Sequence, residues 1–530
     1  MKNMFILLFV FAAVNNLLAE TIEPSEEIRR WIEDKSFTID GETIFSKKSI
    51  PDFYLDRGFE PAWDNDDSIA ELLEQIKLVH QDGLNPEDYH LTYLLEHVKN
   101  VSSVTPMLDI MLTDAYFLLT THLLMGKVNA STIDPEWKSS NKEIELKKTL
   151  THALEEVEVA KSINNVKPKY ETYLKLKQAL AEYEQMKSKE PWPLINSGET
   201  LKPGDNDDRI LQLRARLSFT NYYETPEAPD STLRIYDEAL ASAVKEFQKR
   251  NGLAPDGALG KGTIGALNET LDNKIKKTTI NLERCRWLPT DLGKEHLIVN
   301  IASFQLHAVK DGKTMLTMNV VVGKPYRKTP VFSEKLRYLV FNPYWTVPPT
   351  ILSKDILPSV RKNSNYLNNL NIKVVSGETV IDPSTINWAT TTASNFPYQL
   401  RQDPGPNNAL GIVKFIFPNP YNVYMHDTNH RELFANTDRA LSSGCIRLSR
   451  PKDMAVYILN NTKDEWDEKR VDNIIKTSKN YTVMIKRDIM VHLLYWTAFV
   501  DDNGVVNFRT DIYDRDDAVW KALLQDPPSL

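Results

Sequence analysis

The chain has 530 residues, of which 26% are charged and 42% hydrophobic, and its formal net charge is −8 at pH 7. This balance is that of an ordinary globular chain and argues against a DNA or anionic-membrane partner, while the length allows about three domains. Only two cysteines are present, Cys285 and Cys445, so the chain must bury enough apolar surface to fold without a disulfide framework.

Residues 1–19 have the pattern of a secretory signal peptide. Lys2 precedes an apolar run from Met4 to Val14, and the small residue Ala19 is a suitable cleavage point. The run is shorter than the ~20 residues that span a bilayer, which disfavours the alternative of an uncleaved anchor. We expect a mature protein in the periplasm, with no transmembrane segment after signal cleavage and no cysteine placed to accept a lipid.

Residues 20–200 are expected to form a helical scaffold domain. Apolar residues recur there at helical spacing, as in "YETYLKLKQALAEYEQ", where Tyr173, Leu176, Leu180 and Tyr183 share one face. The sequence of this region has no cluster of carboxylates, histidines or glycines that indicates chemistry. A stretch with proline and glycine, residues 189–208, then predicts a linker.

Residues 201–275 predict a small helical domain. Leu240, Val244 and Phe247 form an apolar stripe, Gly252 lies where a helix would end, and "PDG" predicts a tight turn. This unit resembles the peptidoglycan-binding domain family, whose pattern is matched by Ala243, Val244, Phe247, Gln248, Gly252, Leu253, Asp256, Gly257 and Thr263. Most of these residues determine the fold, so the resemblance supports the domain without locating a ligand groove.

After residue 278 the pattern changes to β-strands, with alternating runs such as "HLIVNIASFQLHAV" and "TMLTMNVVVG". A polar segment at about residues 355–410 interrupts these strands and is expected to be either an inserted lid or a long loop. Residues 491–530 predict a C-terminal hairpin around Asn503 and Gly504, followed by a tail. The fold class expected is multidomain α+β, with a mainly-β domain at residues 276–490.

Cys445 is the first candidate for chemistry, in the stretch "RALSSGCIRLSRP". Gly444 before it allows the backbone to expose the side chain and to aim successive amide N–H groups at one point. His426 precedes Cys445 by nineteen residues and is a candidate base. Beside a protonated histidine, a thiol pKa falls from ~8.5 toward ~3.5–7.5, which predicts a thiolate at neutral pH. The alternatives are that Cys445 is a small buried hydrophobe or pairs with Cys285.

A metal site is the competing interpretation of the sequence around His426. In "HDTNH", His426 and His430 are four residues apart, which is similar to the zinc motif H-E-x-x-H. The preceding residues alternate like a strand, Thr-Asn is a poor helix interior, the acid is aspartate, and no third ligand is near in sequence. We therefore expect neither a metal nor another cofactor.

The combination of Y-x-H-D-T, nineteen residues from histidine to cysteine, and S-S-G-C-I-R resembles the L,D-transpeptidases with a YkuD-type catalytic domain. "VVVGKPYRKTPVFSEKLRYLVFNPYWTVPPTI" and "RQDPGPNNALGIVKFIFPN" are similar to further blocks of that family. The N-terminal "FYLDRGFEPAWDNDD", the peptidoglycan-binding unit and the C-terminal "VHLLYWTAFVDDNGVVNFRTDIYDRD" resemble its large, multidomain YcbB-like branch. The likeness spans nearly all of the chain after residue 19.

The resemblance implies a role for each matching residue. Cys445 would be the nucleophile, His426 the base, the backbone around Asp427 the group that orients the imidazole, and the amides near Gly444 and Cys445 the oxyanion hole. The remaining matches are expected to contact substrate: Arg447, Tyr424 and Ser443. The alternative for Arg447 is a solvated salt bridge, and the alternative for Tyr424 is simple packing. Ser443 stands where the family often has a second histidine, and Asp427 where it often has glycine; both departures agree with the YcbB-like branch.

The activity implied by the resemblance is formation of 3–3 cross-links between peptidoglycan stem peptides through a cysteine thioester. Its partners would be a donor tetrapeptide, an acceptor stem and proteins of cell-wall synthesis, with no nucleic acid. Three alternatives remain open: an L,D-carboxypeptidase in which water is the acceptor, attachment of a lipoprotein to peptidoglycan, and a non-catalytic scaffold that binds the cell wall.

Overall fold

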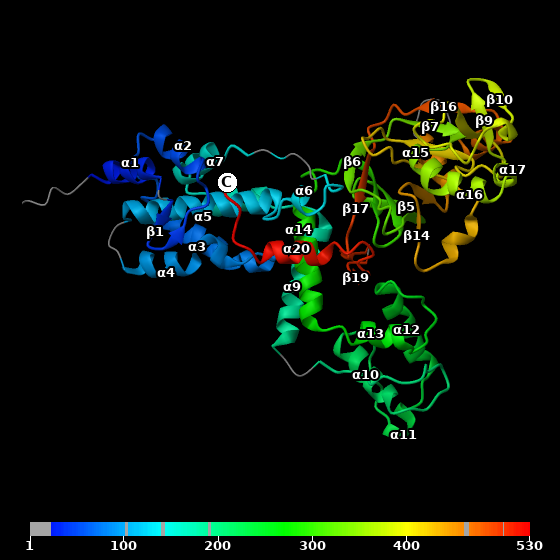
Figure 1. The fold of residues 1–530 in the computed structure, drawn as a ribbon. Coiled ribbons are helices and arrows are strands. Elements are labelled where there is room, and N and C mark those ends of the chain that lie inside the picture. The colour runs from blue at the N-terminus through cyan, green and yellow to red at the C-terminus, as the bar shows by residue number, and fades with distance from the viewer. Residues whose placement is uncertain are drawn as a thin grey trace, which may run out of the picture.

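The structure is a computed structural model that describes residues 23–530 apart from 36, 101–103, 139–141, 143, 189–191, 461–465 and 502. An N-terminal helical region, a small helical domain and a mainly-β domain follow one another along the chain and lie apart in Figure 1, joined by two long helices. The expected fold class is thus confirmed. The signal peptide expected at residues 1–19 lies outside the described residues.

The N-terminal region packs short helices around α5 (Pro106–Met125), of which nearly every residue is buried. The other elements are α1 (Pro24–Asp34), β1 (Thr38–Ile39), β2 (Glu42–Thr43), α2 (Ser49–Asp56), α3 (Asp66–Leu78), α4 (Leu91–Asn100), α6 (Ala130–Ile133), α7 (Leu146–Glu155) and α8 (Val159–Val166). The 3₁₀ turns η1 (Val79–Asp82) and η2 (Pro86–Tyr89) follow α3.

Helix α5 corrects one expectation from the sequence. Within the described part of the chain it is long and apolar enough, by length and composition, to cross a membrane, whereas no such stretch was expected after the signal. However, 94% of its apolar window is buried inside the protein. The apolar surface all around this helix is therefore that of a core helix, covered by its neighbours.

Residues 206–267 form the small helical domain, with α10 (Arg209–Phe219), α11 (Asp230–Leu233), α12 (Glu238–Arg250) and α13 (Lys261–Leu267) around their own core. The residues that match the peptidoglycan-binding pattern bond to one another. The Gln248 amide donates to Asp256 at 2.8 Å and to Thr263 at 3.0 Å, and its oxygen accepts the Gly257 N–H at 2.8 Å. The pattern thus holds the turn after α12.

Two long helices, α9 (Glu171–Lys187) and α14 (Leu271–Arg286), pack side by side and carry the chain to and from the small domain (Figure 1). Residues 279–286 were expected to be β, and the predicted domain boundary at 275/276 falls inside α14. The β-branched run Thr278, Thr279 and Ile280 favours a strand locally, but burial against α9 and α20 (Asp516–Leu523) overrides that preference. The β region begins at Glu295.

The mainly-β domain is an eleven-stranded sheet in the order β16-β7-β12-β13-β15-β5-β4-β3-β17-β6, with β14 also paired to β5. Its strands are β3 (Glu295–Asn300), β4 (Gln305–Lys310), β5 (Lys313–Gly323), β6 (Phe332–Lys335), β7 (Tyr338–Phe341), β12 (Val413–Ile416), β13 (Met425–His426), β14 (Ala440–Ser442), β15 (Ile446–Leu448), β16 (Tyr481–Met484) and β17 (Met490–Leu494). Helices α18 (Pro451–Leu459) and α19 (Glu468–Lys476) lie between β15 and β16 in sequence.

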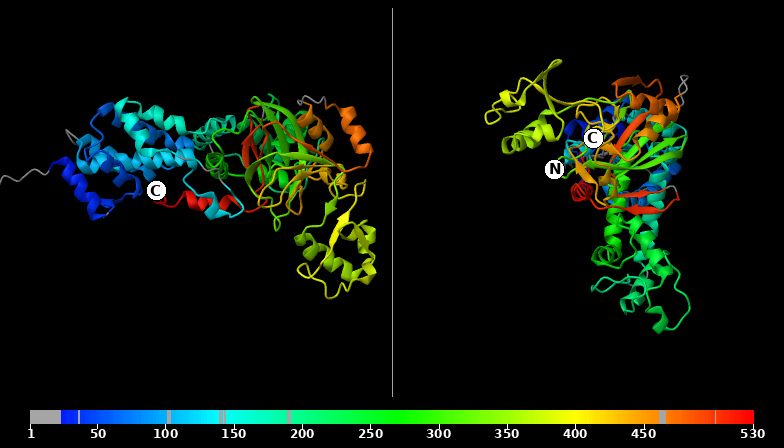
Figure 2. Two further views of the ribbon diagram at one scale, coloured as in Figure 1. Left: turned by 90° about the horizontal axis from the view of Figure 1, so that it is seen from above. Right: turned by 90° about the vertical axis from the view of Figure 1, so that its right-hand side faces the viewer.

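The polar segment expected to be a lid or a loop is a folded insertion. It begins at β8 (Trp345–Thr346) and has its own hydrophobic cluster and a four-stranded sheet in the order β10-β9-β11-β8. It protrudes from the β domain in both views of Figure 2. Its further elements are α15 (Pro349–Ile351), a π-helical turn (Leu352–Ile356), α16 (Leu357–Lys362), α17 (Tyr366–Asn369), β9 (Lys373–Ser376), β10 (Thr379–Ile381) and β11 (Gln399–Gln402).

The C-terminal segment is more than a hairpin and a tail. Strand β17 pairs with β3 and β6 within the main sheet, so the predicted boundary at residue 490/491 divides a strand. The expected hairpin is present as β18 (Ala498–Val500) and β19 (Val506–Phe508). Helix α20 then returns to α14, and the C-terminus lies near the N-terminal helices (Figures 1 and 2).

Candidate active site

Strand register brings the candidate residues together. β13 and β15 are parallel neighbours, with His426 opposite Arg447, and the Ile446 N–H donates to the Tyr424 carbonyl at 3.1 Å. Since side chains alternate along a strand, Tyr424 and His426 point to one side of β13, and Cys445 and Arg447 point to one side of β15. The in-register pairing therefore gathers these four side chains on one face of the sheet.

The His426 ring is held by the backbone that follows it. Its Nδ1 is hydrogen-bonded to the Asp427 carbonyl, and because a carbonyl only accepts, Nδ1 carries the proton. Nε2 is then the basic nitrogen. The ring of Tyr424 lies 5.6 Å from that of His426, centroid to centroid. Burial lowers the pKa of His426 to about 3, helped by the charge of Arg447, so the resting imidazole is neutral.

Cys445 is half-buried and forms no disulfide, so the alternative of a Cys285–Cys445 pair is wrong. Burial raises the pKa of its thiol to about 11, against the opposing effects of a backbone hydrogen bond from Tyr424 and the charge of Arg447. In the resting state both the thiol of Cys445 and the imidazole of His426 are neutral. The thiolate expected from the sequence is therefore disfavoured, because both partners are desolvated.

Gly444 forms the turn that presents Cys445. Its φ of 116° lies in the region that favours glycine. Its carbonyl accepts the Thr329 hydroxyl at 2.8 Å, and its N–H donates to the Ser442 Oγ at 3.1 Å. The Ser442 hydroxyl donates in turn to the Cys445 carbonyl at 2.6 Å. The Gly444 amide, expected to help form an oxyanion hole, must leave Ser442 before it can bind a substrate oxygen.

Asp427 contributes its backbone and its side chain to different contacts. While its carbonyl accepts from His426, its carboxylate accepts the Ile412 N–H at 3.0 Å and an Arg431 nitrogen at 2.8 Å. Gly411 lies against this carboxylate, since a Cβ there would be 2.2 Å from Oδ2. Burial raises the pKa of the Asp427 carboxyl. The side chain fixes the loop whose carbonyl orients the imidazole.

The candidate substrate-contacting residues have different surroundings. Arg447 forms no ion pair with any described residue, and its buried Nε has no hydrogen-bond partner among them. The alternative of a salt bridge for Arg447 thus finds no support there. Ser443 is exposed and accepts a hydrogen bond at 2.9 Å from Arg327, which also pairs with Asp355 of the folded insertion at 2.6 Å. Burial raises the pKa of Tyr424.

The remaining candidates are separate from this face. His430 is exposed and pairs with Glu432 at 3.1 Å, and the described residues contain no group of three or more His, Cys, Asp or Glu side chains able to hold a metal. Cys285 is fully buried in a second hydrophobic cluster, where burial raises its thiol pKa to about 12. A thiol in that environment is chemically inert.

Sequence reasoning assigned no role to three residues that hold the turn around Cys445: Thr329, Arg327 and Tyr513. The Tyr513 hydroxyl donates to the Gly323 carbonyl at 2.6 Å and accepts the Thr329 N–H at 3.1 Å. Thr329 and Arg327 lie in the block "VVVGKPYRKTPVF", which resembles the family but does not reveal these contacts. Tyr513 lies far along the chain, and only the tertiary structure places it there.

Three segments of the chain match known families. Residues 294–471 match the YkuD family, described as "L,D-transpeptidase catalytic domain"; residues 206–267 match a "Putative peptidoglycan binding domain"; and residues 48–180 match a "Scaffold domain". The fold and these matches define a multidomain protein in which a helical scaffold, a small helical domain of the peptidoglycan-binding type and a β domain of the YkuD type follow one another. The chain therefore carries a YkuD L,D-transpeptidase catalytic domain together with a peptidoglycan-binding domain.

The chain is also similar to individual proteins. A "Putative L,D-transpeptidase" of Haemophilus influenzae is 35% identical over 245 residues, which are 46% of this chain and 49% of that protein. The amidase CwlM of Mycobacterium tuberculosis is 32% identical over 84 residues, 15% of this chain and 21% of that one. The chain thus spans about half the length of the first relative. A solved L,D-transpeptidase of Xylanimonas cellulosilytica aligns over 57% of this chain and all of its own, at 16% identity and a TM-score of 0.18.

Proposed function

We propose that the protein is an L,D-transpeptidase that forms 3–3 cross-links between peptidoglycan stem peptides through a thioester on Cys445. The observation that carries the proposal is the register of β13 and β15, which gathers Tyr424, His426, Cys445 and Arg447 on one face of a domain of the L,D-transpeptidase family. The peptidoglycan-binding domain in the same chain is consistent with a wall substrate outside the cytoplasm.

The first half-reaction forms the thioester. Sγ of Cys445 attacks the carbonyl carbon between the third residue of the donor stem, diaminopimelate, and the terminal D-Ala, and its proton passes to Nε2 of His426. Because both groups are neutral at rest, this transfer accompanies the attack. The Asp427 carbonyl, bonded to Nδ1, stabilises the imidazolium. Collapse of the tetrahedral intermediate expels D-Ala, whose amine takes the proton from Nε2.

The second half-reaction transfers the acyl group. The side-chain amine of diaminopimelate in an acceptor stem attacks the thioester carbon, Nε2 of His426 takes a proton from that amine, and the Cys445 sulfur leaves and is reprotonated. The backbone amides of Gly444 and Cys445 stabilise the oxyanion in both steps. The Gly444 amide does so once its hydrogen bond to the Ser442 hydroxyl has broken. Arg447 holds a carboxylate of the stem peptide with its unpaired guanidinium.

Incubation of the purified protein with soluble disaccharide tetrapeptide, followed by mass analysis, tests the proposal. We expect 3–3 dimers and free D-Ala from the native chain, and a loss of at least 10³-fold for Cys445→Ala and for His426→Ala. Cys285→Ser is the matched control and should stay active, because that thiol is fully buried in the hydrophobic cluster of α9, α14 and the C-terminal hairpin. Dimer formation at the native rate by Cys445→Ala would overturn the proposal.

The same experiment separates the alternative functions. Tripeptide without dimer identifies an L,D-carboxypeptidase, and acyl transfer only to an added lysine peptide identifies attachment of a lipoprotein. A chain that binds sacculi but never releases D-Ala is a scaffold. Chelators should leave the activity unchanged, and a carbapenem should add its mass to the peptide that contains Cys445. Inhibition by a chelator that zinc reverses would instead favour a metal at His426 and His430.

A further inference from the structure

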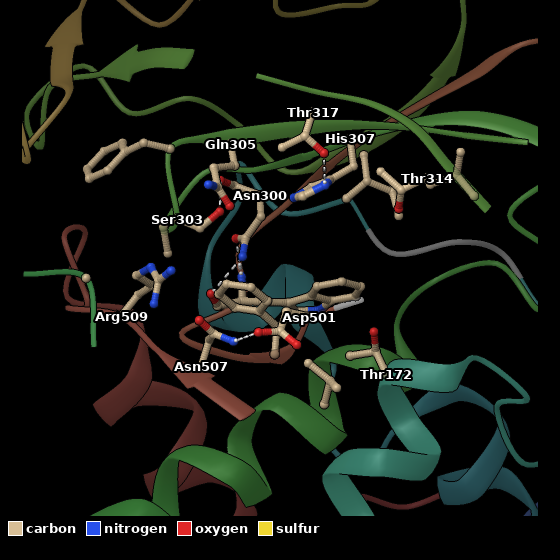
Figure 3. Close-up of a pocket in the computed structure, with 18 of the residues that line it drawn as sticks. Thr172, Asn300, Ser303, Gln305, His307, Thr314, Thr317, Asp501, Asn507 and Arg509 are labelled. Atoms are coloured by element: carbon tan, nitrogen blue, oxygen red, sulfur yellow. Dashed lines mark hydrogen bonds between the residues drawn. The ribbon is translucent and has the colours of Figure 1, made fainter. Parts of the chain in front are cut away.

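A cavity of about 1090 Å³ lies between the β domain, the C-terminal hairpin, the start of α9 and the peptidoglycan-binding domain. Its lining comes from strands β3, β4 and β5, from β18–β19, from Lys249 in the last turn of α12 and from Gly252 after that helix. Neither Cys445 nor His426 is among the residues that line it. Figure 3 shows side chains of the strands on one side of the cavity and of the hairpin on the other. The cavity is therefore separate from the candidate active site.

The floor of the cavity is the outer face of three neighbouring strands. Their register aligns two rows across β3, β4 and β5: Asn300, Gln305 and Asn319, and Ile298, His307 and Thr317. The opposite face of the same strands belongs to the hydrophobic core. A polar outer face of an antiparallel sheet ordinarily contacts only water. Here the hairpin and the peptidoglycan-binding domain enclose it, which gives amide, hydroxyl and imidazole groups a common, sheltered space.

The lining of the cavity contains cations that have no ionic partner in the part of the chain that the structure describes. Within the described residues, no ion pair is formed by any of its four lining cations: Lys169, Lys249, Arg439 and Arg509. Its four carboxylates are all engaged: Asp291, Asp438 and Asp501 accept backbone N–H groups, and Glu171 pairs with Lys175. An anionic ligand would supply the missing partner for the cations.

Arg509 is the best-placed of these cations. One guanidinium nitrogen donates to the Arg250 and Phe508 carbonyls, each at 2.7 Å, and the group lies 5.0 Å from the Phe499 ring centre. Nε and the other terminal nitrogen form no hydrogen bond with the described residues, and Figure 3 shows the side chain at the edge of the cavity. Gly252 makes room for it, since a Cβ there would lie 2.7 Å from Arg509 Cδ. The guanidinium is thus held with two donors available to a carboxylate.

We infer that this cavity is a second peptidoglycan site, which binds a stem peptide through its free carboxylates at Arg509 and through its amides along the polar rows of β4 and β5. The inference rests on the proposed function for the identity of the ligand. The site adjoins the catalytic strands, because Asn319 lies on β5, which pairs with β14 and β15. A stem held here would keep its glycan strand near Cys445 and raise the local concentration of neighbouring stems.

Calorimetry on the full chain with Cys445→Ala, in which no turnover consumes the probe, tests the inference with soluble disaccharide tetrapeptide. We expect two binding events, one of which weakens at least tenfold in Arg509→Gln. Gln305→Ala changes the floor of the cavity but leaves the hydrogen bond from Arg509 to the Arg250 carbonyl in place. It should weaken the same binding event. Arg57→Gln is the matched control, because that guanidinium also bonds only backbone carbonyls and lies in the N-terminal region; it should bind as the parent does.

Two further probes identify the ligand chemistry. Tetrapeptide with every carboxyl group amidated should lose the Arg509-dependent event, and the disaccharide without peptide should lack it. Equal binding of the disaccharide alone would overturn the assignment to the peptide. Parent-like binding by both Arg509→Gln and Gln305→Ala would overturn the site, whatever the turnover. If the native chain makes neither thioester nor dimer while the Arg509-dependent event persists, the proposed activity fails and the site stands.

Discussion

The N-terminal helical region and the peptidoglycan-binding domain are both helical additions to the β domain, but they are joined to it differently. One continuous hydrophobic core runs from the N-terminal helices through α14 into the sheet, whereas residues 195–267 enclose a core of their own. Because cooperativity follows shared burial, the first region should fold together with the catalytic sheet and the second as a separable unit. The scaffold is in this sense part of the catalytic domain.

Buried charges reinforce the shared core where α14 crosses it. Glu283 accepts two nitrogens of Arg286, at 2.6 and 3.0 Å, and both side chains are fully buried. The other oxygen of Glu283 accepts the Val128 N–H at 2.7 Å, and Arg286 donates to the Asp82 carbonyl at 2.8 Å. These contacts tie α14 to two separate loops of the N-terminal region, so the junction depends on a charge pair that water cannot replace.

Glu283→Gln should have the largest effect on the stability of the shared core. The substitution leaves the buried Arg286 without a counter-charge, so we expect the free energy of unfolding to fall by about 3–5 kcal/mol. Denaturant unfolding followed by tryptophan fluorescence measures it, and the N-terminal region and the sheet should unfold together. Glu246→Gln is the control in the peptidoglycan-binding domain: its pair with Arg250 is partly exposed, and about 1 kcal/mol or less is expected. If both variants lose a similar amount of unfolding free energy, the buried Glu283–Arg286 pair does not stabilise a shared core.

Leu213→Ala tests the separable unit. Leu213 of α10 is fully buried in the small core, and the cavity left behind should cost about 2–5 kcal/mol. The loss should stay local, so amide hydrogen exchange should accelerate across residues 206–267 and remain unchanged in α5 and β3–β5. Turnover of soluble tetrapeptide should persist while binding to sacculi weakens. Faster exchange in α5 as well would show that the two cores unfold as one.

The sequence predicted the three parts of the chain, because hydrophobic period and family motifs are local properties. It failed where tertiary packing decides. The run Thr278–Ile280 has strand propensity but lies in a buried helix, and strand β17 belongs to the main sheet, although the sequence assigned it to the C-terminal hairpin. The protonation state of Cys445 and His426 depends on burial, which no spacing reports. Tyr513 reaches the catalytic turn from the far end of the chain.

Low pH should destabilise the core shared by the N-terminal helices and the sheet more than the core of the peptidoglycan-binding domain. His122 of α5 is buried, with its Nδ1 3.1 Å from the Tyr89 hydroxyl, and burial lowers its pKa to about 3. The unfolded chain therefore binds a proton that the folded chain refuses between pH ~6.5 and about 3, and stability falls with falling pH by up to about 1.4 kcal/mol per unit. His426 and His492, with lowered pKa values of about 3 and about 4, act in the same direction. Residues 195–267 contain no histidine.

His122→Asn, which keeps an acceptor for Tyr89, should make this pH dependence less steep without abolishing it. Urea unfolding at pH 7.5, 6, 5 and 4 measures the slope, and hydrogen exchange at pH 5 locates it. The N-terminal helices and the sheet should lose protection before residues 206–267 do. An unchanged slope in the variant would assign the acid sensitivity to other groups.

Tyr513→Phe should cost less stability than Glu283→Gln or Leu213→Ala but should have a specific effect on activity. Its hydroxyl bridges the Gly323 carbonyl and the Thr329 N–H, and Thr329 in turn holds the Gly444 carbonyl next to Cys445. Removing it should cost about 1–3 kcal/mol and lower kcat about tenfold with little change in KM, because the turn that aims the thiol is loosened after substrate has bound. Tyr495→Phe is the matched control: this ring stacks on Tyr513 at 5.4 Å, and its hydroxyl donates to Asp511 and accepts the Tyr513 N–H at 2.8 Å. It therefore loosens the same segment but leaves the Tyr513 hydroxyl bonded to Gly323 and Thr329. If both variants lose activity in proportion to their loss of stability, Tyr513 braces the tail against the shared core and does not position the thiol.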